Sequence, residues 1–441
     1  MKTNLFIFIL LLFFINCFSQ NKESIVVRPL HLSDTALLEL VQKQTFRYFW
    51  EFAHPVSGMA RERSNKTDEY GWETTTTGGT GFGIMATVVA VERKWIERNA
   101  AAARVLKTVN FLRKADKFHG VFPHWLNGET GKVIPFSPKD DGGDLVETSY
   151  LFQGLLAARQ YFNQNSAQEI QLRQKITWLW NEVEWDWYTR GGISVLYWHW
   201  SPNHGWAMNN EIRGWNECLI TYILAASSDK YPIKPDVYHR GWANSSHFKN
   251  EREYYGIKLP LGFDYGGPLF FAHYSFLGID PNGLKDAYAN YWEQNKNHTL
   301  INREHVLRNP NRFKGYSADC WGLTASDNQQ GYAAHSPTED LGVITPTAAL
   351  SSFPYTPEYS MQALKYFYYK LGDKIWSEYG FVDAFNESKN WYAESHLAID
   401  QGPIIVMIEN YRSGLLWKLF MNIPEIQQGM KKLGFQSPYF K

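Results

Sequence analysis

The feature that most constrains the fold of this sequence is an alternation between two kinds of predicted helix. A helix that is apolar on every side must be buried, whereas an amphipathic helix covers a core with one face and meets water with the other. Predominantly apolar segments recur at residues 84–91, 144–162, 210–226, 265–277 and 402–421. Amphipathic or polar segments separate them, at residues 37–52, 100–115, 169–187, 235–243, 286–306 and 357–371, and a short small-residue segment spans 345–352.

This alternation predicts an all-α fold in which an inner circle of about six helices is enclosed by an outer circle of similar size. We therefore expect an (α/α)6 toroid, with short strands confined to the loops at residues 121–134 and 193–200. Within these loops, Gly192–Tyr197 has the composition most typical of a strand. Because no linker is long enough to divide the chain, one catalytic domain is expected over residues 20–441.

The first 19 residues have the composition of a signal peptide. Lys2 provides a positive start, and the apolar run Leu5–Ile15 is shorter than the ~20 residues that span a bilayer. Cleavage after Ser19 is favoured over lipid attachment at Cys17. We therefore expect an exported protein, periplasmic or extracellular, without a transmembrane segment. Two later cysteines, Cys218 and Cys320, could pair in an oxidising compartment, but their spacing does not decide this.

Charge and aromatic content limit the class of ligand. The 44 Lys and Arg residues balance the 44 Asp and Glu residues, so the net charge is +0. Nucleic acids and polyanions call for a basic surface, which this balance disfavours. The chain also has 18 Trp, 26 Tyr and 28 Phe residues. Trp and Tyr combine a flat apolar face with a polar edge, which suits a sugar ring. We expect a monomer that acts on a neutral oligo- or polysaccharide.

The N-termini of the buried helices are the expected place for function. These ends carry partial positive charge and free N–H groups, and in a ring they converge at one end. The richest acidic cluster precedes the segment at 144–162, where Asp140, Asp144 and Glu147 lie within eight residues. An N-terminal capping box is the structural alternative. Crowded carboxylates raise at least one pKa, as a general acid requires.

Two further carboxyl groups lie at apolar segments. Glu217 is expected inside the helix at 210–226, where it would be either a general acid or the partner of Arg213. Glu211 is the reserve candidate in the same stretch. Asp400 precedes Pro403, a residue that suits a first helical turn, and is expected to point into the mouth of the ring.

Aromatic contacts to a substrate are expected from Trp125, Trp215 and Trp321, although each could equally belong to the core. The sequence has no His-Glu-x-x-His motif, no paired cysteine spacing, no phosphate-binding loop and no Gly-x-Ser-x-Gly motif. We therefore expect neither a metal nor a cofactor, and we expect carboxyl groups to carry the chemistry.

Several stretches resemble the glycoamylase-like domain family, and within it the exported β-1,2-glucanases and sophorohydrolases. They are residues 142–156 (GGDLVETSYLFQGLL), 210–220 (NEIRGWNECLI), 380–386 (GFVDAFN), 398–404 (AIDQGPI) and 408–417 (IENYRSGLLW). The resemblance covers essentially the whole mature chain. It implies an (α/α)6 barrel and metal-free hydrolysis of β-1,2-glucan with inversion of the anomeric carbon.

Matched residue by residue, the resemblance places Asp140, Asp144 and Glu147 in the acidic cluster of that branch. It favours Glu217 as the acid and Asp400 as the base, with endo or exo action left open. Another neutral glucan is an alternative substrate. A polysaccharide lyase would need positive groups to neutralise a uronate, which the net charge disfavours, and a non-catalytic glycan-binding protein would leave the carboxylates unexplained.

Overall fold

The computed structural model describes residues 28–64 and 71–440. The predicted signal peptide, with Cys17, lies outside these residues. The chain divides into two units, Met1–His31 and Leu32–Lys441, and the description below concerns the second. None of the helices formed by the described residues is long and apolar enough to cross a membrane.

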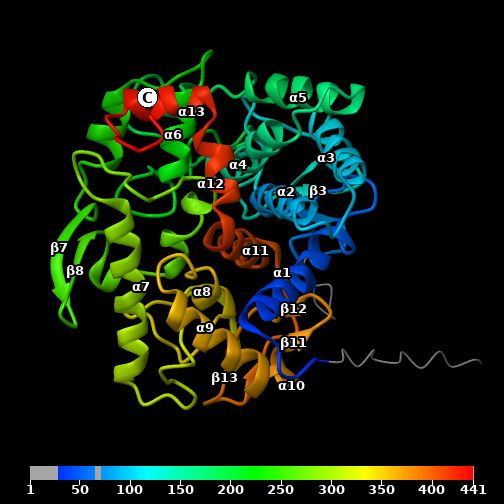
Figure 1. The fold of residues 1–441 in the computed structure, drawn as a ribbon. Helices are drawn as coiled ribbons and strands as arrows, with labels where there is room; N and C mark the ends of the chain where they lie inside the picture. Colours follow the sequence, from blue (N-terminus) through cyan, green and yellow to red (C-terminus); the bar gives the residue numbers. More distant parts are fainter. Residues whose placement is uncertain (1–27, 65–70, 441) are drawn as a thin grey trace, which may run out of the picture. The chain divides into compact units, whose positions relative to one another are not determined.

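The second unit is mostly helical, as the alternation predicted (Figure 1). Its α-helices are α1 (Asp34–Trp50), α2 (Thr77–Glu92), α3 (Arg98–Leu112), α4 (Leu145–Tyr161), α5 (Ala167–Trp180), α6 (Leu219–Ser227), α7 (Tyr291–Arg308), α8 (Pro346–Leu350), α9 (Pro357–Lys365), α10 (Gly372–Ile375), α11 (Ala398–Ser413), α12 (Leu415–Met421) and α13 (Pro424–Lys432).

Buried and half-exposed helices do alternate along much of the chain. Helices α2, α4, α6 and α11 are buried over nearly their whole length. Helix α2 packs against α4 and α11, and α4 also packs against α6. Half-exposed helices cover this group: α1 packs against α11, and α13 packs against α6. Helices α3 and α5 pack against each other.

Glycine allows the central contact between α2 and α4. A Cβ atom on Gly81 would lie 2.1 Å from the carbonyl oxygen of Tyr150, and one on Gly154 would lie 2.0 Å from that of Gly81. Any side chain at either position would force the helices apart. The glycine-rich stretch 78–83 lies within α2.

Three predicted helices are shorter or differently wound than expected. The segment at 210–226 is helical only from Leu219, because Gly214 has a φ of +79°. The segment at 265–277 forms three 3-10 turns, η3 (Asp264–Gly266), η4 (Leu269–Ala272) and η5 (Ser275–Leu277), because residues 265–267 all have positive φ. Gly414, with a φ of +69°, separates α11 from α12.

The remaining helical elements are two π-helical segments, η2 (Val237–Trp242) and η6 (Tyr366–Lys370), and the 3-10 turn η1 (Trp187–Thr189).

The strands are short and pair in antiparallel fashion. The predicted strands at 121–134 are confirmed as β3 (Trp125–Asn127) and β4 (Val133–Ile134), which join β2 (Thr74–Thr76). The strand predicted at Gly192–Tyr197 is wrong, because Gly192 has a φ of +96°; the strand here is β6 (His199–Trp200), paired with β5 (Gly143–Asp144). The others are β1 (Arg63–Ser64) with β15 (His396–Leu397), β7 (Lys249–Tyr254) with β8 (Ile257–Leu261), β9 (Ala325–Asn328) with β10 (Gly331–Ala334), β11 (Trp376–Ser377) with β12 (Gly380–Phe381), and β13 (Phe385–Asn386) with β14 (Trp391–Tyr392).

The two later cysteines do not form a disulfide. Cys218 and Cys320 are both free thiols, and each is buried in a different hydrophobic cluster. Both act as small apolar side chains of the core.

Candidate active site

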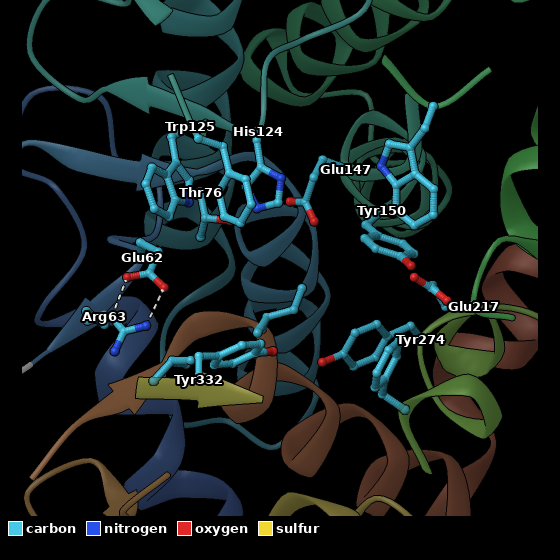
Figure 2. Close-up of a pocket in the computed structure, with 15 residues that line it drawn as sticks. Glu62, Arg63, Thr76, His124, Trp125, Glu147, Tyr150, Glu217, Tyr274 and Tyr332 are labelled. Carbon is cyan, nitrogen blue, oxygen red and sulfur yellow. Dashed lines mark hydrogen bonds and ion pairs between the residues drawn. The ribbon is translucent and has the colours of Figure 1, made fainter. Parts of the chain in front are cut away.

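A cavity of about 270 Å³ opens where the N-termini of the buried helices meet (Figure 2). Thr76 precedes α2, Glu147 lies in the first turn of α4, Glu217 lies in the turn before α6, and Ile399 lies in the first turn of α11. The other lining residues are Glu62, Arg63, His124, Trp125, Phe136, Tyr150, Trp198, Phe270, Tyr274, Tyr332 and Leu397. Three carboxyl groups, one guanidinium, one imidazole and seven Trp, Tyr and Phe side chains therefore surround one space.

Asp144 is fixed behind the wall of this cavity and is fully buried. It caps α4, and its Oδ1 accepts the backbone N–H groups of Val146 and Glu147 at 3.0 and 2.9 Å. Its Oδ2 lies 3.1 Å from Nδ1 of His124 and 3.4 Å from Nε2 of His199. Burial alone would raise the pKa of Asp144, but the two imidazoles hold it well below its usual range. Asp144 is thus an anion and the cap of the helix.

The two imidazoles are correspondingly positive. Burial would lower their pKa values, but Glu147, Asp140 and Asp144 outweigh it. The pKa of His124 rises to about 9 and that of His199 to about 10. Asp140, which lies 3.3 Å from Nε2 of His199, completes this buried cluster of opposite charges and does not line the cavity.

Glu147 faces the cavity beside His124 in Figure 2. Its Oε2 accepts the backbone N–H of Gly78, at the start of α2, at 2.7 Å. Burial raises the pKa of Glu147 to about 7, against the opposing charge of His124. A carboxyl group that titrates near neutrality can either donate or accept a proton.

Glu217 lines the cavity opposite the hydroxyl group of Tyr150 in Figure 2. It lies in the turn before α6 and not inside the helix as predicted. Arg213 is not its partner, because Arg213 pairs with Glu211 and donates to the carbonyl oxygen of Gly241 at 3.0 Å. Burial raises the pKa of Glu217 to about 7, and the charges of Asp144 and Glu147 add to this.

Asp400 lies in the first turn of α11, one residue beyond the lining residue Ile399. Its carboxyl group is buried and does not itself line the cavity. Burial raises the pKa of Asp400 to about 8. Burial raises the pKa values of two lining residues, Tyr274 and Tyr332, and the charge of Asp400 adds to this.

The predicted aromatic contacts divide between wall and core. Trp125 lines the cavity and packs edge-on against Phe136, with ring centroids 4.9 Å apart. Trp215 and Trp321 are fully buried in separate hydrophobic clusters and do not reach the cavity. Their places in the fold differ, because Trp125 lies on β3 at the cavity wall whereas Trp215 and Trp321 lie in segments packed inside those clusters.

Glu211 and Arg213 also lie outside the wall. They pair with each other on a partly exposed surface, and Glu211 accepts a hydrogen bond of 2.9 Å from the hydroxyl group of Tyr197. Their proximity to Glu217 in sequence is lost because Gly214 turns the chain between them.

Several wall residues carried no recognisable sequence signal. Glu62 and Arg63 form an ion pair of 2.8 Å at β1, and Tyr332 reaches the cavity from the β9–β10 hairpin. The available signal was two loop sequences in which imidazole and indole rings adjoin, Phe122-Pro123-His124-Trp125 and Trp198-His199-Trp200. Tertiary pairing alone brings His199 to the same cluster, through β5 and β6.

His124, Asp140 and Asp144 each place one potential ligand atom within 4.8 Å of the others, a spacing that could hold a metal ion. The same atoms also have partners without a metal, because Asp144 pairs with His124 and His199 and Asp140 pairs with His199.

The chain is similar to a known protein family and to several solved structures. The Glycoamylase family model matches residues 209–424. The endo-β-1,2-glucanase of Chitinophaga pinensis, solved with sophorotriose and glucose, is 57% identical with a TM-score of 0.91, covering 93% of this chain and 100% of that one. A crystal structure from Bacteroides uniformis is 60% identical with a TM-score of 0.92, covering 94% of this chain and 100% of that one.

A curated exo-β-1,2-glucooligosaccharide sophorohydrolase (non-reducing end) of Parabacteroides distasonis is 46% identical over 436 residues. The match covers 94% of this chain, which spans 60% of the length of that relative. A glucoamylase of Saccharomycopsis fibuligera, 11% identical with a TM-score of 0.55, shares the fold alone. The fold and the carboxyl-lined cavity define a carbohydrate-active helical protein, and the chain belongs to the glycoamylase family.

Proposed function

We propose that this protein is an inverting glycoside hydrolase that cleaves β-1,2-glucan. The observation that carries this proposal is the match to the Chitinophaga pinensis endo-β-1,2-glucanase, which extends over 100% of that chain at 57% identity. The cavity supports it, because its aromatic wall suits sugar rings and its carboxyl groups suit acid and base catalysis.

Glu217 is the proposed general acid. Its pKa of about 7 leaves a large fraction protonated at neutral pH, and its carboxyl group faces the cavity. It would give its proton to the glycosidic oxygen as the bond from that oxygen to the anomeric carbon breaks. A water molecule would add to the anomeric carbon from the opposite face, which inverts the configuration.

Asp400 is the proposed base that takes the proton of this water. Its carboxyl group is buried beside the lining residue Ile399 in the chain and does not itself line the cavity. The proton would therefore reach Asp400 through a relay, by way of a substrate hydroxyl group or an intervening water. A relay also relaxes the separation of ~6.5–9.5 Å that direct inverting pairs require.

Glu147 is the proposed anchor for a substrate hydroxyl group, and Asp140 and Asp144 hold the histidines that support it. Glu147 is already oriented by the N–H of Gly78, so it presents its free oxygen to the cavity without rearrangement. Trp125 and Phe136 are the proposed stacking surfaces beside it.

Endo cleavage is the primary proposal, since the full-length match is to an endo-acting enzyme. Release of sophorose from chain ends is the second candidate, supported by the 46% identity to the sophorohydrolase. Incubation with linear β-1,2-glucan and sizing of the products over time separates them. Mixed lengths indicate endo action, disaccharide alone indicates exo action, and no new reducing ends would refute hydrolysis. Release of an unsaturated, ultraviolet-absorbing product would instead indicate a lyase.

We further propose that the buried helices close into an (α/α)6 toroid around this cavity. The contacts that link α11, α2, α4 and α6 in succession support this. Export by cleavage after Ser19 and a monomeric state are also proposed. Sequencing the N-terminus of the secreted protein and measuring its mass in solution test these two points.

A further inference from the structure

The cavity wall contains one carboxyl group that the proposed mechanism does not use, that of Glu62. This residue directly precedes β1, lines the cavity and has 13% of its side chain exposed. Figure 2 shows Glu62 beside Arg63 and Trp125, on the side of the cavity opposite Glu217. Glu62 therefore faces a part of the cavity away from the proposed acid.

The backbone of Glu62 is fixed independently of its carboxyl group. Its N–H donates to the carbonyl oxygen of Thr74 on β2 at 3.1 Å, and its own carbonyl oxygen accepts the N–H of Ala398, the first residue of α11, at 3.0 Å. The next residue, Arg63, pairs with Leu397 where β1 meets β15. The carboxyl group of Glu62 is therefore not required to hold this segment in place.

The side chain of Glu62 is held in one orientation by Arg63. Nε of Arg63 donates to Oε2 of Glu62 at 2.8 Å, and Nη2 donates to Oε1 at 3.2 Å. On its other side, Nη1 of Arg63 lies 3.0 Å from both oxygens of Asp327 on β9. A planar guanidinium between two carboxyl groups orients both of them. Burial raises the pKa of Glu62, and the charge of Arg63 opposes this.

The balance of charge and of hydrogen bonds points to a ligand that donates hydrogen bonds. Asp327 alone would balance the charge of Arg63 and tie β1 to the β9–β10 hairpin, so Glu62 adds a second anion to one cation. Among residues 28–64 and 71–440, only Arg63 donates to the Glu62 oxygens, one N–H to each. A carboxylate has about four acceptor sites, so Glu62 can accept further donors from the cavity.

We propose that Glu62 is a substrate-binding residue, whose carboxylate accepts hydrogen bonds from the hydroxyl groups of a sugar unit, with Arg63 as the positioning residue that orients it. Trp125, beside Glu62 in Figure 2, supplies an apolar surface for the same sugar ring. A neutral sugar fits this place, because its hydroxyl groups are donors and it brings no second negative charge next to Glu62. The inference rests on the proposed function in that the ligand is a glucan.

A binding experiment tests the inference without relying on turnover. Calorimetric titration of Glu217→Gln, with and without Glu62→Ala, would use trisaccharides of glucose with β-1,2, β-1,3, β-1,4 or α-1,4 linkages. Affinity for each trisaccharide that Glu217→Gln binds should fall about tenfold or more when Glu62 is replaced, because a hydrogen bond to a charged group is lost. The variant should fold, since Arg63 keeps its pairing with Asp327.

Glu169→Ala is the matched control in the same background. Arg98 donates to both oxygens of Glu169, at 2.8 and 3.0 Å, but this pair lies outside the cavity. Its loss should lower the Tm and leave the affinity for sugar unchanged. An equal loss of affinity in the Glu169 and Glu62 variants would overturn the inference, because the effect would then be a general loss of structure.

The outcomes separate this inference from the proposed function. If the β-1,2-linked trisaccharide binds and Glu62→Ala changes its affinity less than about twofold, the inference fails and the proposed function stands. If a trisaccharide of another linkage binds instead and its affinity falls in Glu62→Ala, the inference stands and the proposed linkage fails. Binding of none of the four refutes both.

Steady-state kinetics on the Glu62→Ala single variant provides a second readout. An interaction away from the reacting bond contributes equally to the ground state and the transition state, so its loss raises KM and leaves kcat nearly unchanged. We expect KM to rise about tenfold and Glu62→Gln, which keeps one acceptor oxygen, to recover part of this. Arg63→Lys should also raise KM, because an ammonium group cannot hold both oxygens of Glu62 in its plane. A fall in kcat with KM unchanged in Glu62→Ala would overturn the inference.

Discussion

The backbone N–H of Gly78 donates a hydrogen bond of 2.7 Å to Oε2 of Glu147, so the N-terminus of one buried helix holds the carboxyl group of the next. Both residues belong to the first turns of their helices, α2 and α4. The partial positive charge at the start of α2 favours a carboxylate here, and burial opposes it. The site is organised by these helix ends.

This contact predicts that Gly78→Ala impairs activity. An added Cβ would lie 2.5 Å from Oε2 of Glu147 and 2.9 Å from Cδ2 of Tyr150, so the carboxyl group must move. We expect kcat/KM to fall about tenfold or more, the order of effect that misplacement of a catalytic-site group has. In the Glu147→Ala background the same substitution should cause little further loss, and a fully additive loss would contradict this explanation.

Glu217→Gln should abolish most turnover and leave the fold intact. Removal of a general acid costs roughly 10²–10⁴-fold in rate, and glutamine cannot donate the proton. The release of reducing ends from β-1,2-glucan measures the loss, and circular dichroism checks the fold. Glu211→Gln is the control six residues earlier, outside the cavity, and should keep its activity. Near-wild-type turnover in Glu217→Gln would remove Glu217 from the acid role.

Phe136→Ala should raise KM more than it lowers kcat. Phe136 is 49% exposed, lines the cavity and stacks on His124 with ring centroids 4.1 Å apart. Its loss removes a face on which a sugar ring could pack, while little buried area is lost. Trp178→Ala is the control, since Trp178 is 41% exposed but lies on α5, away from the cavity. Steady-state kinetics on oligosaccharides of defined length would show the difference, and an equal rise in KM for both variants would argue against a subsite at Phe136.

Stability should fall as the pH rises from about 6.5 to about 10. Below pH 6.5 four buried histidines with lowered pKa values, His273, His298, His335 and His396, act in the opposite direction to the raised groups. Glu147 and Glu217 have folded pKa values of about 7, above the ordinary value of about 4.3, so their contribution is complete below that value and is lost through about pH 7. His124 and His199 have raised pKa values of about 9 and 10, so their contribution is complete below about pH 6.5 and is lost above pH 9.

Thermal unfolding across this pH range measures the effect. His199→Asn should flatten the upper part of the curve, because its raised pKa no longer contributes there. A wild-type Tm that increases between pH 6.5 and pH 10 would be inconsistent with the charged histidine cluster.

The sequence by itself determined the helical class and where on the chain the site would lie. Buried helices such as α4 are apolar on all sides over many turns, and this property is local. Glu147, Glu217 and Asp400 lie at or near the starts of apolar segments. This placement in the sequence was enough to predict them as site residues.

Tertiary structure decided which side chains face the cavity. Trp125 lines it whereas Trp215 is buried in the core, although both are indoles near predicted site residues. Positive φ angles at Gly214 and at residues 265–267 replaced expected helix with turns, which moved Glu217 to a loop. Helical periodicity does not reveal such breaks, because a few dihedral angles set them.

The charge states also depended on the tertiary structure. His124 and His199 are far apart in sequence, yet both lie beside Asp144, and β5–β6 pairing is what brings His199 there. A pKa follows from burial and from charges within a few ångströms, and these distances exist only after the chain has folded.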